Sequence, residues 1–329
     1  MGRAAEPVPS GSPKRETSLF ARRFVVAWGV ALATACATDG TTAPGAVGEE
    51  PPVSGSAVAF PIDRGEDPAA PDTYKGLPLR LVDTGEPTVT SVDGVIGLVC
   101  VGMSNGHQEC ADFQARLEAG LVGGVNPAVR VVNCAVGGHA IERWIDPAED
   151  AELWNRCVER RLPAAGVRLD QVRVVWHKAA NQFTTGPDGQ PLPSYPSTGS
   201  DYEAFYQNLT AFAVRVGEEF PAAQAVYTSS RSYGGYATRA ARGEPLSYEE
   251  GHALNRWLAD HPTFEGVWYG WGGYLWAPAC LSGIVNGSGI CYEREDYVAD
   301  GIHPSPSGRA KVSRILHRRF GEHGWYRGR

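Results

Sequence analysis

Gly94-Val-Ile-Gly-Leu-Val-Cys-Val-Gly-Met-Ser-Asn105 joins a short apolar run to a small polar turn. Residues 95–101 contain almost no polar side chain, which is the pattern of a strand buried on both faces, as in a parallel sheet. The residues from 108 onward have the pattern of a helix. Open α/β sheets bind ligands at the carboxyl ends of their central strands, and Ser104 stands at such an end.

Ser104 has two interpretations. As a nucleophile it would carry its own N–H close to a helix N-terminus, a position that favours a developing negative charge. As a cap it would only begin the helix. The stretch alone favours the cap, and the rest of the chain favours the nucleophile.

Apolar and helical patterns alternate along the chain. This alternation predicts an α/β fold with a parallel sheet and helices on both faces. The expected strands are 95–101, 129–136, 172–176, 222–228 and 266–269, and the expected helices are 108–119, 148–162, 201–220, 248–260 and 306–320.

The composition suits one enzyme-sized domain. The chain has 329 residues, 43% of them hydrophobic, and a formal net charge of −7. This length is ample for a single α/β core. The mild acidity and the lack of a basic stripe argue against nucleic acid as a partner.

The chain opens with a targeting pattern. Arg22-Arg23 precede an apolar run, 24–35, that is too short to span a bilayer. The run ends in Leu32-Ala-Thr-Ala-Cys36, which resembles a bacterial lipoprotein signal with Cys36 as the lipidated residue; an ordinary secretory signal is the alternative. We therefore expect an export signal over 1–36, a flexible linker over 37–72, and a catalytic domain over 73–329 that contacts a membrane only through the lipid.

Six cysteines remain after Cys36, and an even number in an exported protein suggests disulfides. Cys280 and Cys291 flank a short loop and form the pair that we expect. The pairing of the other four stays open. Cys100 and Cys134 lie in apolar strands, where a buried free thiol is an alternative.

Polar and glycine-rich segments follow the predicted strands. Because the carboxyl ends of parallel strands share one edge of a sheet, we expect these segments to converge there. They are Ser104-Asn105, Gly137-Gly138-His139, His177-Lys178-Ala-Ala-Asn181 and Asp300-Gly-Ile-His303.

Asp300 and His303 lie three residues apart near the end of the chain. A histidine can accept a proton from a serine and return it to a leaving group. It needs a partner that orients its ring and stabilises the imidazolium, and Asp300 is suited to that role.

Acyl transfer also needs donors for an oxyanion. Glycine allows close backbone approach and exposes its N–H, so Gly137 and Gly138 are candidates, together with the Ser104 N–H and the Asn181 side chain. Taken singly, the glycines could equally form a turn and Asn181 a loop.

Ser104, Gly137 or Gly138, Asn181 and His303, in this order, resemble the four signature residues of the SGNH (GDSL-like) hydrolase superfamily. Gly-Met-Ser-Asn replaces the usual Gly-Asp-Ser and is closer to the Gly-Gln-Ser-Asn form of the carbohydrate acetylesterase branch. The segment 133–144 is similar to that branch's Gly-Gly-Thr-x-Ile-x-x-Trp. In the third block, Lys178-Ala-Ala-Asn181 lacks the usual glycine.

The resemblance implies a three-layer flavodoxin-like fold and a metal-free serine hydrolase. Together with the targeting pattern, it leads us to expect an exported serine esterase without a cofactor. It would remove acyl groups, with acetyl favoured, from a carbohydrate or similar polyol, and we expect a monomer. The alternatives are a lipase- or thioesterase-like hydrolase, with 184–199 as a lid, and a non-catalytic glycan-binding surface protein. Candidate substrate-binding residues are His139, His177, Lys178, Arg231, Tyr233 and Trp271.

Overall fold

The computed structural model describes residues 79–146, 148, 150–178 and 180–328. The predicted export signal with Cys36 and the predicted linker lie outside these residues. Among the described residues, no helix is both long and apolar enough to cross a membrane.

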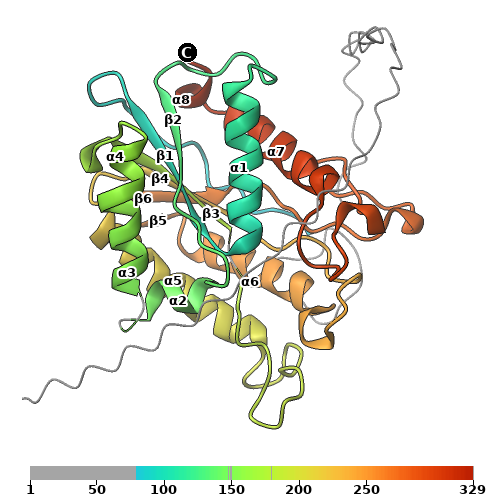
Figure 1. Cartoon of the computed structure of the whole chain (residues 1–329). Coiled ribbons are helices and arrows are strands. Elements are labelled where there is room, and N and C mark those ends of the chain that lie inside the picture. Colours follow the sequence, from blue (N-terminus) through green and yellow to red (C-terminus); the bar gives the residue numbers. More distant parts are fainter. Residues whose placement is uncertain (1–78, 147, 149, 179, 329) are drawn as a thin grey trace, which may run out of the picture. The chain divides into compact units, whose positions relative to one another are not determined.

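A six-stranded sheet forms the centre of the described domain, and all but one of its strand pairings are parallel (Figure 1). The strand order is β2-β1-β3-β4-β6-β5, and only the edge strand β5 runs antiparallel. The chain passes from β2 across β1 to β3, so the order reverses beside β1. The strands are β1 Ile96–Gly102, β2 Val129–Asn133, β3 Val172–Lys178, β4 Ala225–Ser229, β5 Thr263–Phe264 and β6 Val267–Trp271.

Strand β1 is fully buried, as its apolar sequence predicts. Its side chains alternate between the two faces of the sheet, because successive residues of a strand point to opposite sides. Leu98 and Cys100 belong to the core on one face, and Val99 and Val101 belong to the core on the other.

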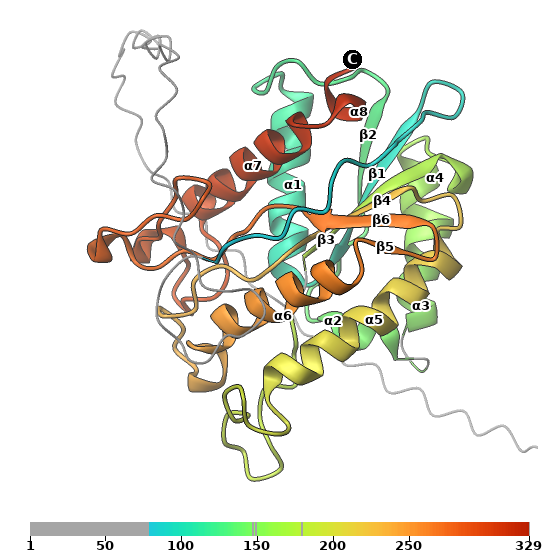
Figure 2. The same ribbon diagram turned by 180° about the vertical axis from the view of Figure 1, so that it is seen from behind.

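Helices cover both faces of the sheet, which gives three layers (Figures 1 and 2). Helices α1 and α7 supply the core on one face through Phe113 and Leu316. Helices α2, α3, α5 and α6 supply the other through Trp144, Trp154 and Phe205 among others. The helices are α1 Ser104–Glu118, α2 Ile141–Ile145, α3 Asp150–Asn155, α4 Leu162–Ala164, α5 Asp201–Glu219, α6 Leu246–Asp260, α7 Pro306–Gly321 and α8 Gly324–Arg327.

The predicted fold class is confirmed, and the differences are local. The predicted helix 148–162 is divided into α3, a π-helical segment Arg156–Arg161, and α4. Strand β3 runs to Lys178 instead of ending at residue 176. The short elements α2, β5 and α8 were not predicted, because none is long enough to show a periodic pattern.

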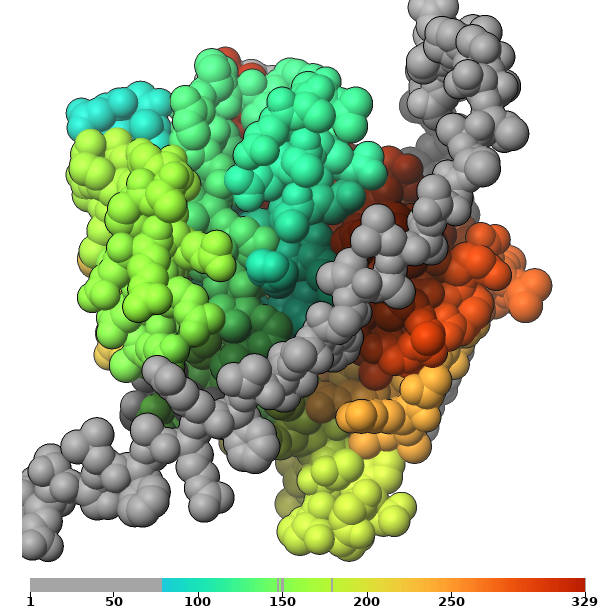
Figure 3. All heavy atoms as spheres, viewed as in Figure 1, coloured from blue at the N-terminus to red at the C-terminus, as the bar shows by residue number. Residues whose placement is uncertain are grey.

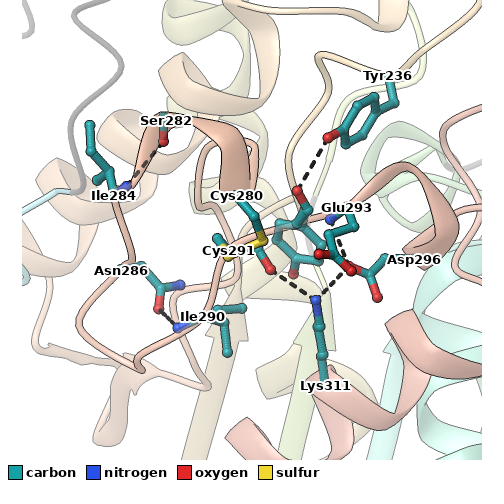
Figure 4. The surroundings of a disulfide bond; sticks show 11 residues. Tyr236, Cys280, Ser282, Ile284, Asn286, Ile290, Cys291, Glu293, Asp296 and Lys311 are labelled. Carbon is teal, nitrogen blue, oxygen red and sulfur yellow. Dashed lines mark hydrogen bonds and ion pairs between the residues drawn. A yellow bond between two sulfur atoms is a disulfide. The ribbon is translucent and has the colours of Figure 1, made fainter.

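The predicted disulfide Cys280–Cys291 is present (Figure 4). Lys311 of α7 fastens this loop, because its Nζ donates to the Cys291 carbonyl at 3.0 Å and contacts the Asp296 carboxylate at 2.5 Å. The other four cysteines form Cys100–Cys110 and Cys134–Cys157. The alternative of buried free thiols at positions 100 and 134 is therefore wrong.

The segment 184–199 extends beyond α5 and α6 (Figure 3). Most of its residues are exposed. It is tied to the domain by the Thr184 hydroxyl, which donates to the Ala241 carbonyl at 2.6 Å, and by the Tyr195 N–H, which donates to Glu249 at 3.3 Å.

Candidate active site

The turn that carries Asp300 and His303 is held by its own hydrogen bonds. The Asp300 Oδ1 accepts the N–H groups of Ile302 at 2.9 Å and His303 at 3.0 Å, the local bonding that lets aspartate form turns. Gly301 has a φ of +69°, and a Cβ at this position would lie 1.7 Å from the Tyr236 carbonyl oxygen. Glycine is therefore needed here for both its backbone conformation and its size.

Three side chains from two distant parts of the sequence meet at this turn. The Ser104 Oγ lies 2.8 Å from the His303 Nε2, and the His303 Nδ1 lies 2.5 Å from the Asp300 Oδ2. This hydroxyl–imidazole–carboxylate order is that of a serine nucleophile with its base and the group that orients the base. The serine and histidine are 199 residues apart in sequence, so the fold brings them together.

Asp300 is set up to stay ionised. Partial burial works against its charge, but the hydrogen bonds from the His303 ring and from two backbone N–H groups outweigh this and hold the pKa of Asp300 below its ordinary value. An ionised carboxylate at this place can hold the Nδ1–H of His303 and leave Nε2 free to accept a proton.

Ser104 is the first residue of α1, directly after the buried strand β1. Helix α1 thus begins four residues earlier than predicted. Asn105 joins this helix start to the turn, because its Nδ2 donates to the Ile302 carbonyl at 2.9 Å. The bond fixes the serine relative to the histidine, a positioning role for Asn105 that the sequence did not reveal.

Backbone donors surround the serine. A Cβ on Gly137 would lie 3.9 Å from the Ser104 Cβ. Gly138, with a φ of +80°, and Ser104 both line one surface pocket. Among the described residues, the N–H groups of Ser104, Gly137 and Gly138 donate no hydrogen bond. They are therefore free to bind an oxyanion at the N-terminus of α1.

Asn181 lines the pocket, but its side chain forms hydrogen bonds with residues of α5. Its Nδ2 donates to Asp201 Oδ1 at 2.9 Å and to the Asp201 carbonyl at 3.4 Å, and its Oδ1 accepts from Asn208 at 2.9 Å. The prediction that this amide donates to the oxyanion does not agree with the geometry, because both of its N–H groups are already used.

A pocket of about 410 Å³ opens beside the serine and histidine. This volume lies within the usual range for small-molecule sites. Of the predicted substrate-binding residues, Arg231 and Tyr233 line it. His139 lies outside the lining, half-buried, with its Nδ1 2.8 Å from the Gly137 carbonyl.

His177 and Lys178 do not bind substrate in this geometry, and both predictions need correction. His177 is fully buried, its ring stacks on Phe212 of α5 at 3.8 Å, and burial lowers its pKa to about 3. Lys178 borders the pocket, but its Nζ is buried against Glu109 of α1, 2.5 and 2.7 Å from the two carboxylate oxygens.

The aromatic residues after the later strands are mostly core. Trp271 is 2% exposed and donates its indole N–H to Asn255 at 2.9 Å, so its predicted contact with substrate is wrong. Trp276 and Tyr274 are buried as well. Tyr233, the other aromatic candidate for substrate binding, borders the pocket.

Two further arginines border the pocket, and no sequence pattern marks them as site residues. Arg239 and Arg242 line the pocket from the loop between β4 and α6, where no strand end marked them. Among the described residues, no group of His, Cys, Asp or Glu side chains is arranged to hold a metal ion.

The fold and site together define an α/β protein with a Ser–His–Asp arrangement at the carboxyl edge of its sheet. No protein-family model and no curated protein matches the chain. Solved structures do match, and several of them are described as GDSL-like or G-D-S-L family proteins.

Three of these structures show the level of similarity. A lipolytic protein of the G-D-S-L family from Veillonella parvula is 12% identical, with a TM-score of 0.42 over 69% of this chain and 99% of its own. A GDSL-like lipase from Bacteroides thetaiotaomicron is 9% identical, with a TM-score of 0.41 over 70% and 90%. An acetyl esterase mutant with an acetate ion is 8% identical, with a TM-score of 0.42 over 69% and 97%. At these identities and TM-scores the similarity assigns no function to this chain.

Proposed function

We propose that the protein is a serine esterase that removes acyl groups, acetyl above all, from a carbohydrate or a similar polyol. The observation that carries the proposal is the hydrogen-bonded series from the Ser104 hydroxyl through His303 to Asp300, at 2.8 and 2.5 Å. The open pocket beside it supports a small substrate.

In the proposed reaction, His303 Nε2 takes the hydroxyl proton while the Ser104 Oγ attacks the acyl carbon. The N–H groups of Ser104 and Gly138, or Gly137, hold the negative oxygen that forms. His303 then gives its proton to the departing alcohol, which leaves an acyl-serine. A water molecule, deprotonated by the same ring, attacks the acyl-serine. His303 then returns this proton to the Ser104 Oγ as the bond to the acyl carbon breaks, which releases the carboxylic acid and restores the serine.

A lipase- or thioesterase-like activity would use the same groups and remains the second candidate. In this candidate the exposed segment 184–199, which is tied to the domain through Thr184 and Tyr195, would act as a lid. A preference for 4-nitrophenyl octanoate over 4-nitrophenyl acetate would decide for this second candidate.

Export to the cell envelope is also part of the proposal. The three disulfides support it, since such bonds persist in oxidising compartments. Attachment through Cys36 would show as a lipid-dependent mass increase on the mature chain, and this increase would be lost in Cys36→Ala.

Ser104→Ala tests the activity itself. We expect hydrolysis of 4-nitrophenyl acetate to fall by about 10⁴-fold or more, because no other group replaces the attacking oxygen. The melting temperature should stay close to wild type, and a fluorophosphonate should label the wild type only. A wild-type chain that neither reacts with the probe nor turns over esters would instead support a non-catalytic glycan-binding protein.

A further inference from the structure

The pocket beside Ser104 is lined with positive charge, although the chain has a net charge of −7. Arg231, Arg239 and Arg242 all border it. The carboxylate in its lining is Asp300, which is engaged by His303. The pocket therefore presents more guanidinium charge than its own lining neutralises.

Arg231 is 94% buried and incompletely paired. Its nearest carboxylate oxygen, Glu250 Oε2, lies 3.7 Å from its Nε, and its Nη1 has no hydrogen-bond partner among the described residues. Glu250 is a weak partner, because its other oxygen accepts the Asn181 N–H at 2.7 Å and burial raises its pKa. A buried guanidinium with an unused donor is costly unless a ligand satisfies it.

The other two arginines have no ion pair within the described ranges. Arg242 donates to the backbone carbonyls of Asn181 at 3.1 Å and Gln182 at 2.7 Å, and neither acceptor carries a charge. Arg239 is exposed, and its side chain makes no hydrogen bond to any residue that the structure describes. Both charges therefore remain available to a ligand in the pocket.

The loop that carries the arginines is fixed to the reacting groups. The Thr238 N–H and hydroxyl donate to the Asp300 carbonyl at 3.0 and 3.2 Å. Gly301 packs directly on the Tyr236 carbonyl, where a Cβ would not fit. The backbone next to Arg239 is thus tied to the turn that carries Asp300 and His303.

We propose that the pocket selects esters that carry an anionic group close to the acyl group, such as an acylated sugar acid. Arg231 would hold the anion by charge-assisted hydrogen bonds, and Arg239 would strengthen its attraction from the rim. This inference rests on the proposed esterase activity and adds a charge requirement to it.

The test compares matched esters that differ in charge. One pair is a mono-O-acetylated methyl glucuronoside and the corresponding glucoside, which places the anion on the alcohol. The other is 4-nitrophenyl hemisuccinate and 4-nitrophenyl butyrate, which places it on the acyl group. We expect kcat/KM to favour the charged member of at least one pair by about tenfold at low salt, and the preference to shrink as salt is added.

Variants of the arginines then show which side chain causes the preference for charged esters. Arg239→Gln should reduce the charged-to-neutral ratio by about threefold, since an exposed charge contributes modestly. Arg231→Gln should reduce it by about tenfold or more. Arg239→Lys should keep part of the ratio, and Arg160→Gln, an equal charge change at an exposed site outside the pocket, should leave activity and ratio as in the wild type.

The outcomes separate the inference from the proposed function. Wild-type hydrolysis with a ratio of one or less in both pairs would overturn the inference and leave the esterase intact. A ratio that neither Arg239→Gln nor Arg231→Gln changes would also overturn it. Because Arg239 is exposed, its variant remains informative if Arg231→Gln fails to fold. No hydrolysis of any of these esters would overturn both.

Discussion

The ends of strands β1 and β3 lie side by side, but the polar residues at these two ends point to different places. Both run in parallel, and Val101 and Gly102 of β1 pair with His177 and Lys178 of β3. After β1 the chain turns at once into α1 and presents Ser104 to the pocket. At β3 the polar residues are still inside the strand, so their side chains enter the two covering layers.

The difference lies in the residue at which each strand ends. The sequence pattern places the end of the third strand at residue 176, which would leave His177 and Lys178 free at the sheet edge. The strand continues through both, and neighbouring residues of a strand point to opposite faces. His177 therefore meets Phe212 on one side, and Lys178 meets Glu109 on the other. A polar residue near a strand end is in the site only if the strand has ended before it.

The largest effect that separates the two regions is expected from Asp300→Asn. An amide would leave His303 without the charge that orients its ring and stabilises the imidazolium, so kcat should fall by about 10⁴-fold with little change in melting temperature. The measurement is kcat for 4-nitrophenyl acetate together with a thermal melt. A loss smaller than tenfold would show that the 2.5 Å contact to the ring has no part in catalysis.

Lys178 should instead affect stability. Burial lowers its pKa and raises that of Glu109, and each charge is held by the other. Lys178→Met leaves a buried carboxylate unpaired and should cost about 3–5 kcal/mol in the free energy of unfolding, measured in urea.

The double variant Lys178→Met/Glu109→Leu is the matched control. It removes both charges, so most of the lost stability should return, and hydrolysis should be close to that of the wild type. A double variant that is stable but inactive would show that Lys178 has a chemical role after all.

Asp201, which holds Asn181, provides a pH-dependent test. Burial raises its pKa to about 6, although the hydrogen bond from Asn181 opposes this. Because the pKa is raised in the folded state, the contribution of this carboxyl to stability is full below about pH 4 and is lost as the pH rises through 6. Relative to wild type, Asp201→Asn should therefore gain up to about 3 kcal/mol between pH 4 and pH 8.

The measurement is the free energy of unfolding at both pH values. Asp188→Asn, in the exposed segment 184–199, is the control and should show no such gain. A constant difference between wild type and Asp201→Asn would mean that Asp201 is ionised throughout this range, and that its contact with Asn181 is charge-assisted.

The fold and the reacting groups could be predicted from the sequence, because both depend on patterns of a few neighbouring residues. The apolar run before Ser104 and the Asp300-to-His303 spacing each lie within a few residues and each predicts a defined geometry. The Cys280–Cys291 bridge was predictable for the same reason. The arginines of the pocket were not, since Arg239 and Arg242 follow no strand directly and reach the site through the packing of Tyr236 on Gly301.

The direction of the Asn181 side chain could not be predicted from the sequence motif. Its position in the chain matches the third block of the superfamily, and it does border the pocket. The direction of its amide is set by Asp201 and Asn208, which come from α5. No spacing within the motif itself contains that information, because the partners are 20 and 27 residues away.

The smallest effect is expected from His177→Phe, and it tests the comparison most directly. A neutral imidazole with no hydrogen-bond partner among the described residues is a buried polar group without compensation, which costs about 1–3 kcal/mol. Phenylalanine would keep the stack on Phe212 and remove that cost, so stability should stay equal or rise by about 1 kcal/mol, while kcat/KM changes less than twofold. If hydrolysis were lost while the melting temperature held, His177 would have to reach the substrate, and the strand end would belong to the site as its sequence first suggested.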